Sequence, residues 1–281
     1  MAKYALLCDV EKCTGCFACF LACKDEHVGS GHAPYAAPAS EGQKWMDIKE
    51  IEYGVGDKVK VDYIPVMCQH CNAPACAKDA PDSAICIRKD GIVLIDTEKA
   101  KGAGSIVKNC PYGAVYWNEA LELPQKCTLC AHILDSGAGT TRCVECCPTG
   151  ALVFGDMENP DSDISKLATK LSDCLESYKP QFGTQPRVKY HALPQPFVAG
   201  AIAFSDRKGE PACGIHIMLT CNDTGKTLEA VTDAFGDFIF KRLKSGEACT
   251  LQIKTPGYTP VECKLRINVA QNLGTITLQR K

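Results

Sequence analysis

Cysteine is the residue type in this chain whose number and spacing point to chemistry. Twelve of the 20 cysteines fall into four blocks along the sequence. The blocks are Cys13-x2-Cys16-x2-Cys19-x3-Cys23, Cys68-x2-Cys71-x4-Cys76, the single Cys110-Pro111, and Cys127-x2-Cys130 followed by Cys143-x3-Cys147-Pro148. Three thiolates at such spacing can converge on one iron–sulfur cube, while a fourth thiolate arrives from another block. The pattern therefore predicts iron–sulfur clusters and, with several clusters in one chain, the transfer of single electrons.

Two other uses of cysteine fit this pattern less well. Disulfide bonds suit small secreted proteins, but cysteines separated by two residues point at a shared ion rather than at distant partners. Structural zinc would suit Cys68 and Cys71, or Cys127 and Cys130, but not the unbroken run from 13 to 23. A further alternative is that the clusters only hold the fold together, as structural zinc does.

The remaining cysteines do not share this spacing, and we expect them to be free thiols: Cys8, Cys86, Cys146, Cys174, Cys213, Cys221, Cys249 and Cys263. Cys146 is an alternative ligand because it directly precedes Cys147. The proline after Cys147 matches the proline after Cys110, which favours Cys147 as the ligand.

The composition excludes several classes of protein. The net charge is −2, and the chain has no basic stripe of the kind that binds nucleic acid. No stretch approaches the roughly 18 apolar residues of a membrane-spanning helix. Asp9 interrupts the apolar N-terminus too early for a signal peptide. We therefore expect a cytoplasmic protein without a membrane span of its own, which would be periplasmic only if a partner exported it in folded form.

No motif indicates substrate chemistry on this chain. It lacks a nucleophile elbow, a phosphate-binding glycine loop and a recognisable pair of catalytic carboxylates. Its histidines do not form a recognisable site either. His70 lies between two ligand cysteines and His132 follows a ligand by two residues, so each could hydrogen-bond a cluster or simply pack beside it. We expect a subunit without catalytic residues.

Short turns and strands that repeat along the first part of the chain must position these cysteines. Cys110-Pro-Tyr-Gly-Ala-Val-Tyr-Trp and Cys147-Pro-Thr-Gly-Ala-Leu-Val-Phe share one plan, in which a ligand is followed by a turn and a short apolar strand. Ala80-Pro-Asp-Ser-Ala-Ile-Cys-Ile repeats this plan with alanine in place of the ligand. Asp90-Gly91 then predicts a hairpin turn before a strand at residues 92–95. Residues 1–155 thus resemble a tandem of bacterial-type ferredoxin modules.

Residues 156–196 differ in composition and are expected to form a helix followed by an extended connector. Ser162 or Asp163 can cap this helix. Its apolar positions follow at spacings of three and four residues: Ile164, Leu167, Leu171 and Leu175. Prolines then recur up to Pro196, which favours an extended segment.

From about residue 197 the apolar residues alternate with polar ones, as in half-buried strands. The alternating segments are 198–204, 215–219, 237–240, 251–253 and 273–278, and glycine-containing turns separate them. This pattern is typical of a small β-sandwich. Residues 197–281 also resemble the transthyretin-like carboxypeptidase regulatory domains. The expected fold class is therefore α+β, with a ferredoxin-like iron–sulfur module followed by an all-β transthyretin-like sandwich.

The cysteine motifs give residues 4–155 a more specific resemblance. They are similar to the four-cluster electron-transfer subunits of the dimethyl sulfoxide reductase superfamily of molybdenum and tungsten enzymes. In that family the two outer blocks exchange one ligand, and so do the two inner blocks. The resemblance implies three [4Fe–4S] clusters, each with its own ligand set. The first set is Cys13, Cys16, Cys19 and Cys147, and the second set is Cys127, Cys130, Cys143 and Cys23. The third set is Cys68, Cys71, Cys76 and Cys110.

The same resemblance implies that a fourth cluster is absent. The family's spacing places its ligands at four positions, where this chain has Ala80, Ala100, Ala103 and Ile106. One whole ligand set is missing, while the other three sets are complete. We expect the alanine and isoleucine side chains to fill the vacated space as packing.

The resemblance narrows to one branch of this superfamily when three features are combined. They are the three clusters, the connector at residues 183–190 and the C-terminal sandwich. It contains the small subunit of pyrogallol–phloroglucinol transhydroxylase and related enzymes that hydroxylate or dehydroxylate phenols. The resemblance implies an anaerobic heterodimer, in which a large catalytic subunit holds molybdopterin with molybdenum or tungsten and acts on polyhydroxylated aromatics. Two alternatives stay open: a mainly structural and docking subunit whose clusters only maintain the redox state, and an independent ferredoxin.

Overall fold

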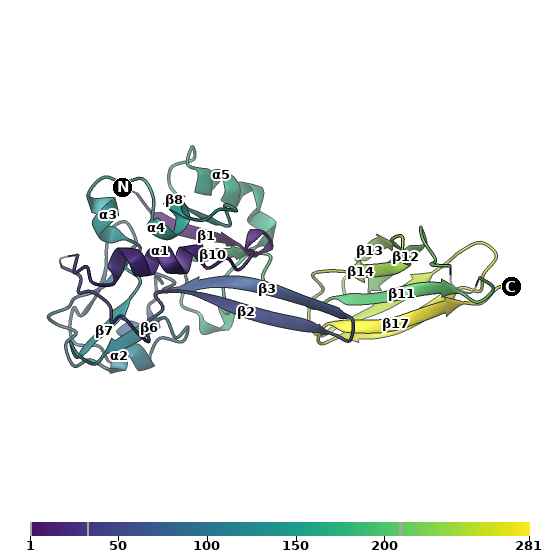
Figure 1. Ribbon diagram of the computed structural model, residues 1–281, viewed down its shortest axis with the longest axis horizontal. Helices are drawn as coiled ribbons and strands as arrows, with labels where there is room; N and C mark the ends of the chain where they lie inside the picture. Colours follow the sequence, from purple (N-terminus) through teal and green to yellow (C-terminus); the bar gives the residue numbers. More distant parts are fainter. Residues whose placement is uncertain (1, 33, 208–209) are drawn as a thin grey trace. The chain divides into compact units, whose positions relative to one another are not determined.

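The computed structural model describes residues 2–32, 34–207 and 210–281. The chain forms two compact units (Figure 1). Unit 1 comprises Met1–Glu50 and Asp62–Leu193, and unit 2 comprises Ile51–Val61 and Pro194–Lys281. Among the described residues, none of the helices has the length and apolar character that a bilayer-spanning helix needs. Unit 1 contains every cysteine of the three ligand sets, so its fold positions the candidate centres.

A four-stranded sheet with the order β8-β1-β10-β9 forms the centre of unit 1. Its strands are β1 (Tyr4–Asp9), β8 (Leu152–Asp156), β9 (Leu175–Glu176) and β10 (Val188–His191). β1 pairs antiparallel with β8 and parallel with β10, so Cys8 lies opposite both Leu152 and Tyr190. The residues of β1 after Tyr4 are all buried because both faces of the strand are covered: Leu6 and Cys8 pack in the main core, and Ala5 and Leu7 pack against Ile164.

A long hairpin of β2 (Met46–Val55) and β3 (Lys58–Met67) contributes residues to both units. The alternating segments expected from the sequence do not include it. Its base is buried, and Met46 and Ile64 belong to the core of unit 1. Its tip requires Gly54, which has a φ of +133°, and an added Cβ there would lie 2.2 Å from the carbonyl oxygen of Lys58.

Short helices and small hairpins surround the central sheet of unit 1. The helices are α1 (Ala18–His27), α2 (Ser105–Lys108), α3 (Ala131–Asp135) and α4 (Arg142–Glu145). The hairpins are β4 (Ile85–Ile87) with β5 (Val93–Ile95), and β6 (Val115–Asn118) with β7 (Leu123–Lys126). The predicted turn at Asp90-Gly91 is confirmed between β4 and β5, where Gly91 has a φ of +92°. α1 packs against α4 (Figure 1), which brings the first cysteine block next to the last.

α5 (Asp163–Lys170) is the helix expected after the cysteine region, but it is shorter than predicted. Ser162 caps it by accepting a hydrogen bond from the Ser165 backbone N–H at 3.2 Å, which confirms one of the two predicted caps. The prediction that the helix continues to Leu175 is wrong. Leu175 pairs instead with His191 of β10, because the central sheet accepts a fourth strand there.

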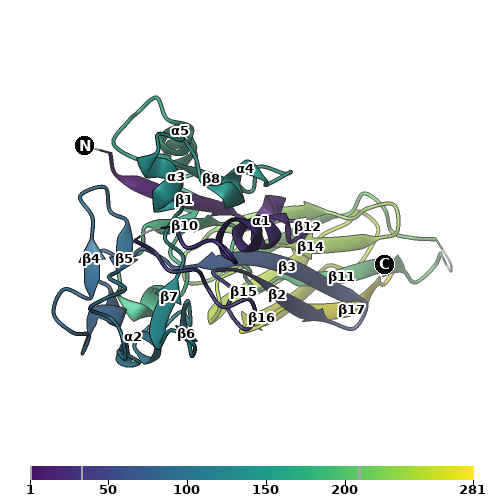
Figure 2. The ribbon, with the colours of Figure 1, turned by 60° about the vertical axis from the view of Figure 1, so that its left-hand side comes forward.

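Unit 2 consists mainly of two β-sheets with the orders β14-β11-β17 and β13-β12-β15-β16 (Figure 2). Their strands are β11 (Val198–Phe204), β12 (His216–Cys221), β13 (Thr227–Val231), β14 (Asp237–Phe240), β15 (Glu247–Ile253), β16 (Val261–Ile267) and β17 (Gln271–Leu278). Residues from both sheets share one apolar core, including Ile217, Phe238 and Leu251. The predicted alternating segments each overlap a strand, although Ile215 lies just before β12, whereas β13 and β16 were not predicted. The transthyretin-like type of this sandwich stays a prediction.

Candidate iron–sulfur centres

The cysteines of the first ligand set line one small cavity in unit 1. They are Cys13 and Cys16 from the loop before α1, Cys19 from the first turn of α1, and Cys147 from the loop after α4. Apolar side chains close the rest of the cavity, including Ile48 and Leu152. The structure therefore brings together the four cysteines of the expected first ligand set, which come from opposite ends of the cysteine region.

Gly15 allows the first cysteine loop to lie close to the hairpin strand β3. Its φ is +67°, and an added Cβ would come within 2.5 Å of the Tyr63 ring. Any side chain at this position would displace Tyr63 or the loop that carries Cys13 and Cys16. The glycine in this loop is thus part of what places these two thiols.

Hydrogen bonding distinguishes Cys147 from its neighbour Cys146. Burial acts to raise the pKa of Cys147, but hydrogen bonds from the Leu152 and Thr149 backbone N–H groups and others outweigh it and lower that pKa. Burial raises the pKa of Cys146, whose thiol donates to the Cys143 carbonyl oxygen at 3.4 Å. Donors aimed at sulfur favour the thiolate, which is the form that binds iron. These hydrogen bonds agree with Cys147 as the expected ligand, and the choice between the two cysteines stays a prediction.

The second ligand set gathers cysteines from three parts of unit 1: Cys23 from α1, Cys127 and Cys130 from the segment between β7 and α3, and Cys143 from α4. Burial raises the pKa of Cys23, and the other three thiols raise it further because their charges lie close to it. The backbone N–H of Leu129 donates to the sulfur of Cys127 at 3.3 Å. The hydroxyl of Thr141 lies 3.3 Å from the sulfur of Cys143.

The third ligand set combines the loop after β3 with two turns: Cys68 and Cys71 from the loop, Cys76 from the turn Ala75–Ala77, and Cys110 after α2. Burial raises the pKa of Cys76 to about 12, and the nearby Cys68 adds to this effect. Burial raises the pKa of Cys71 to about 11, while a hydrogen bond from the Thr184 hydroxyl opposes the shift. The backbone N–H of His70 donates to the sulfur of Cys68 at 3.5 Å.

The second set interacts electrostatically with both other sets of unit 1. Besides burial, the thiol of Cys19 in the first set contributes to raising the pKa of Cys143 in the second set. Besides burial, the thiol of Cys68 in the third set contributes to raising the pKa of Cys127 in the second set. The second set thus lies near enough to a cysteine of the first set and to a cysteine of the third set for their charges to act on it.

A buried lysine lies beside the second and third sets. Lys126, at the end of β7, is 3% exposed and donates hydrogen bonds to the carbonyl oxygens of Val93 and Cys127. Burial raises the pKa values of Cys76 and Cys110, and the positive charge of Lys126 acts in the opposite direction. This cation stabilises negative charge on nearby sulfur.

The donor sets fit [4Fe–4S] clusters. Each set gathers sulfur atoms whose negative charges would repel one another, and all of these cysteines except the exposed Cys16 are buried or half-buried, which limits their solvation by water. A positively charged iron–sulfur core would offset this repulsion. Backbone and hydroxyl donors already contact sulfurs of these sets, which is how proteins stabilise such clusters.

Comparison with known proteins agrees with this chemistry. Residues 59–157 match the family model described as a 4Fe-4S dicluster domain. The pyrogallol hydroxytransferase small subunit of Pelobacter acidigallici is 34% identical over 289 residues, which cover 99% of this chain and 100% of that protein. The chain belongs to the iron–sulfur subunits of the dimethyl sulfoxide reductase superfamily. The family predicted from the cysteine motifs is thereby confirmed, and the chain is an electron-transfer subunit of a molybdoenzyme complex.

Other members of this family match a smaller share of the chain. One subunit of the tetrathionate reductase of Salmonella typhimurium is 32% identical over 196 residues, which cover 70% of this chain and 75% of that protein. Among solved structures, 5-hydroxyisourate hydrolase of Klebsiella pneumoniae overlaps 31% of this chain and 90% of its own chain, with 19% identity and a TM-score of 0.25. A likeness at that level does not assign the sandwich to a type.

In this iron–sulfur subunit, the positions expected for a fourth ligand set lie in a packed apolar cluster. They are Ala80, Ala100, Ala103 and Ile106. Ala100 and Ile106 have no exposed surface, and Val115 and Leu123 of the hairpin β6–β7 pack in the same cluster. Cys76 of the third set also belongs to it. The space beside the third set is filled with side chains that cannot bind iron.

The histidines that flank ligand cysteines have different surroundings. His70 is 1% exposed, and its Nε2 has no hydrogen-bond partner among the described residues. His132 contacts the Glu26 carboxylate through Nε2 at 2.9 Å, and its ring stacks on His32 with centroids 3.8 Å apart. Burial lowers the pKa of the adjacent His27 to about 4, so this ring is neutral at ordinary pH.

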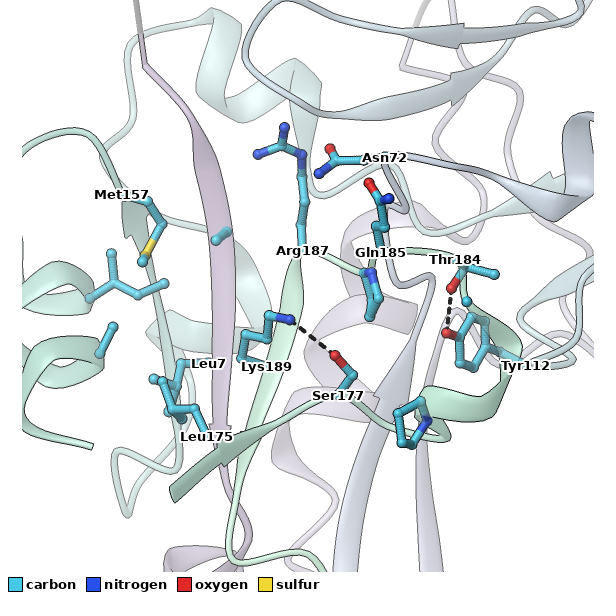
Figure 3. A pocket seen from close by; sticks show the side chains of 16 residues that line it. Leu7, Asn72, Tyr112, Met157, Leu175, Ser177, Thr184, Gln185, Arg187 and Lys189 are labelled. Atoms are coloured by element: carbon cyan, nitrogen blue, oxygen red, sulfur yellow. Dashed lines mark hydrogen bonds between the residues drawn. The ribbon is translucent and has the colours of Figure 1, made fainter. Parts of the chain in front are cut away.

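A pocket of about 550 Å³ opens in unit 1 beside the third set (Figure 3). Asn72, Gln185 and Arg187 lie at its polar side, and Leu7 and Leu175 lie at its apolar side (Figure 3). Backbone hydrogen bonds join this wall to the loop of Cys71: Asn72 N–H donates to the Gln185 carbonyl at 3.0 Å, and Ala73 N–H donates to the Thr184 carbonyl at 3.1 Å. The pocket wall thus helps to place the loop of Cys71, an expected ligand of the third set.

Sequence reasoning did not identify Thr141, Thr184 or Lys126, which contact or polarise ligand sulfurs. A single threonine or lysine has no spacing signal, and each acts here through the tertiary structure. Thr149 could have been found, because it lies in the turn of the repeat that begins at Cys147.

Proposed function

We propose that this subunit relays single electrons through three [4Fe–4S] clusters to or from a large catalytic subunit that holds molybdopterin. The ligands would be the twelve cysteines of the first, second and third sets. The clusters would supply one-electron redox chemistry. The residues of this chain would set the position of each cluster and the ease with which it is reduced.

The observation that carries this proposal is that the fold gathers all three cysteine sets in unit 1, with the second set close enough to interact with both others. The charge of Cys19 acts on Cys143, and the charge of Cys68 acts on Cys127, so each of these two pairs of sets interacts electrostatically. A cluster that only stabilised a fold would not need two others beside it. The apolar cluster around Ile106 supports a count of three rather than four.

The substrate class of the complex is proposed from the likeness over the whole chain. The relative that this chain matches over 99% of its length is named for hydroxyl transfer to or from pyrogallol. We therefore propose that the large partner acts on polyhydroxylated aromatics, in a heterodimer that can assemble further. We also propose a cytoplasmic location and, for residues 197–281, a transthyretin-like sandwich.

A second candidate function is structural support of the large partner. The name of that relative, a hydroxytransferase, favours it. Transfer of a hydroxyl group between two phenols has no net redox change. In that case the subunit would mainly dock and support its partner, and its clusters would only maintain the partner's redox state.

An anaerobic redox titration of the purified complex separates these functions. If the subunit relays electrons, substrate reduces or oxidises at least one cluster, and electron paramagnetic resonance detects the change. If substrate leaves every cluster unchanged while product forms, the relay proposal is wrong and the supporting role stands.

A further inference from the structure

Unit 2 contains a pair of buried thiols that the iron–sulfur function does not use. Cys221 ends β12, and Cys249 lies in β15 directly opposite it in the antiparallel register. Cys221 is 3% exposed and Cys249 is fully buried. The thiol of Cys249 donates to the sulfur of Cys221 across 3.6 Å. The sequence predicted both residues to be separate free thiols.

The sheet geometry explains why these side chains meet. The backbone N–H of Asn222 donates to the Ala248 carbonyl oxygen at 2.8 Å, just beyond the pair. Cys221 and Cys249 therefore form a pair without hydrogen bonds between their own backbones, and side chains approach most closely at such positions. Neighbouring strands hold both sulfurs, so their separation is set by the fold.

A carboxylate completes the group. Glu247 lies two residues before Cys249 on β15, so both side chains lie on the same face of the sheet. The ligand atoms of Cys221, Cys249 and Glu247 all lie within 4.8 Å of one another. The Thr224 hydroxyl, in the turn after β12, donates to Glu247 Oε1 at 3.4 Å and orients this carboxylate.

The distances suit a tetrahedral metal ion. Zinc binds thiolate sulfur at about 2.3 Å, so two sulfurs at a tetrahedral angle lie about 3.8 Å apart. The two sulfurs here are 3.6 Å apart. A disulfide would require a separation of about 2.05 Å. It would also require an oxidant, which neither the structure nor the proposed function supplies.

We propose that Cys221, Cys249 and Glu247 form a zinc site, with the fourth position open to water. Thiolate and carboxylate are ordinary zinc ligands. Each thiol releases its proton when its sulfur binds the ion, and no electron is transferred. The ion joins β12 to β15 at one end of the sandwich. This site is separate from the three cysteine sets, so the proposal does not depend on the electron-relay function.

Zinc content and zinc titration of the complete chain, with its clusters reconstituted anaerobically, test this proposal. The wild-type chain is expected to bind one equivalent of Zn²⁺ beyond its iron. Glu247→Gln, at the partly exposed edge of the site, is expected to weaken this binding at least about tenfold, a loss of about 1.4 kcal/mol. The double variant Cys221→Ser/Cys249→Ser is expected to lose it.

The matched control is Cys213→Ser/Cys263→Ser, which removes two other thiols of unit 2 and should bind zinc as the wild type does. Iron content and thermal unfolding show whether each variant is still folded. If the wild type and Glu247→Gln bind zinc equally well, or if neither binds it, the site does not exist. Mass spectrometry of the native chain provides a second check. A mass lower by two hydrogens, caused by a disulfide between Cys221 and Cys249, would also overturn the proposal.

Discussion

The backbone N–H of Val93 donates a hydrogen bond to Nδ1 of His70 at 3.0 Å. A neutral His70 ring must therefore carry its proton on Nε2. That nitrogen is buried and has no partner among the described residues, and His70 lies between two ligands of the third set. We predict that this nitrogen donates a hydrogen bond to the cluster that the third set would hold, rather than only packing beside it.

His70→Asn tests this role. Asparagine tolerates the left-handed backbone of His70, which has a φ of +43°, and its side-chain oxygen can still accept from Val93. The shorter asparagine side chain has no N–H donor at the position of the His70 Nε2. A lost hydrogen bond of about 1 kcal/mol corresponds to a fall of roughly 40 mV in the one-electron reduction potential of the third cluster. His216→Asn, on an exposed position of β12, is the control. Equal potentials in His70→Asn and wild type would leave packing as the role of this residue.

Cys146 and Cys147 provide a matched pair for the first cluster. Cys147→Ser is expected to remove the cluster, because its thiolate receives the hydrogen bonds from the turn after α4. Cys146→Ser should keep the cluster, because its thiol only donates to the Cys143 carbonyl. Iron content and electron paramagnetic resonance of both variants provide the measurement. Loss of a cluster in Cys146→Ser alone would reverse the assignment.

Cys110 tests the exchange of ligands between blocks. If Cys110 belongs to the third set, Cys110→Ser lowers the iron content by about four atoms per chain. The remaining clusters should keep their spectra. The cluster that disappears should be the one that Cys76→Ser also removes. Loss of different clusters in these two variants would contradict the third ligand set.

Ile106 tests whether the fourth ligand set has been replaced by packing. Because the side chain of Ile106 is fully buried, Ile106→Ala should lower the free energy of unfolding by about 2–5 kcal/mol. The measurement is anaerobic unfolding in guanidinium chloride, in which the variant should lose its cluster absorbance at a lower denaturant concentration than the wild type. The iron content should not change. Leu121→Ala, at a residue that is 43% exposed, should change stability by less than about 0.5 kcal/mol. A loss of iron without a loss of stability would argue against a packing role.

Much of unit 1 could be predicted because cysteine spacing and turn residues are local signals. The ligand blocks, the Asp90-Gly91 turn and the Ser162 cap each depend on a few neighbouring residues. β10 could not be predicted in the same way, since Val188 pairs in parallel with Leu6 from the other end of unit 1. The hairpin β2–β3 has an exposed outer half that reduces its alternating signal.

The residues that tune the candidate centres were harder to predict than the ligands. Thr184 and Lys126 have ordinary sequence surroundings, and their effect on sulfur depends on strands and loops that fold against distant cysteines. Cys221 and Cys249 are 28 residues apart without a metal-binding motif, and only the β12–β15 register brings them together.

The most direct test of the central claim is the content of iron and acid-labile sulfide in the anaerobically purified chain, with electron paramagnetic resonance of the reduced protein. Three ligand sets predict about twelve irons and about twelve sulfides per chain, together with the spectra of three interacting [4Fe–4S] clusters. About sixteen irons would show that a fourth cluster is present and would contradict the account.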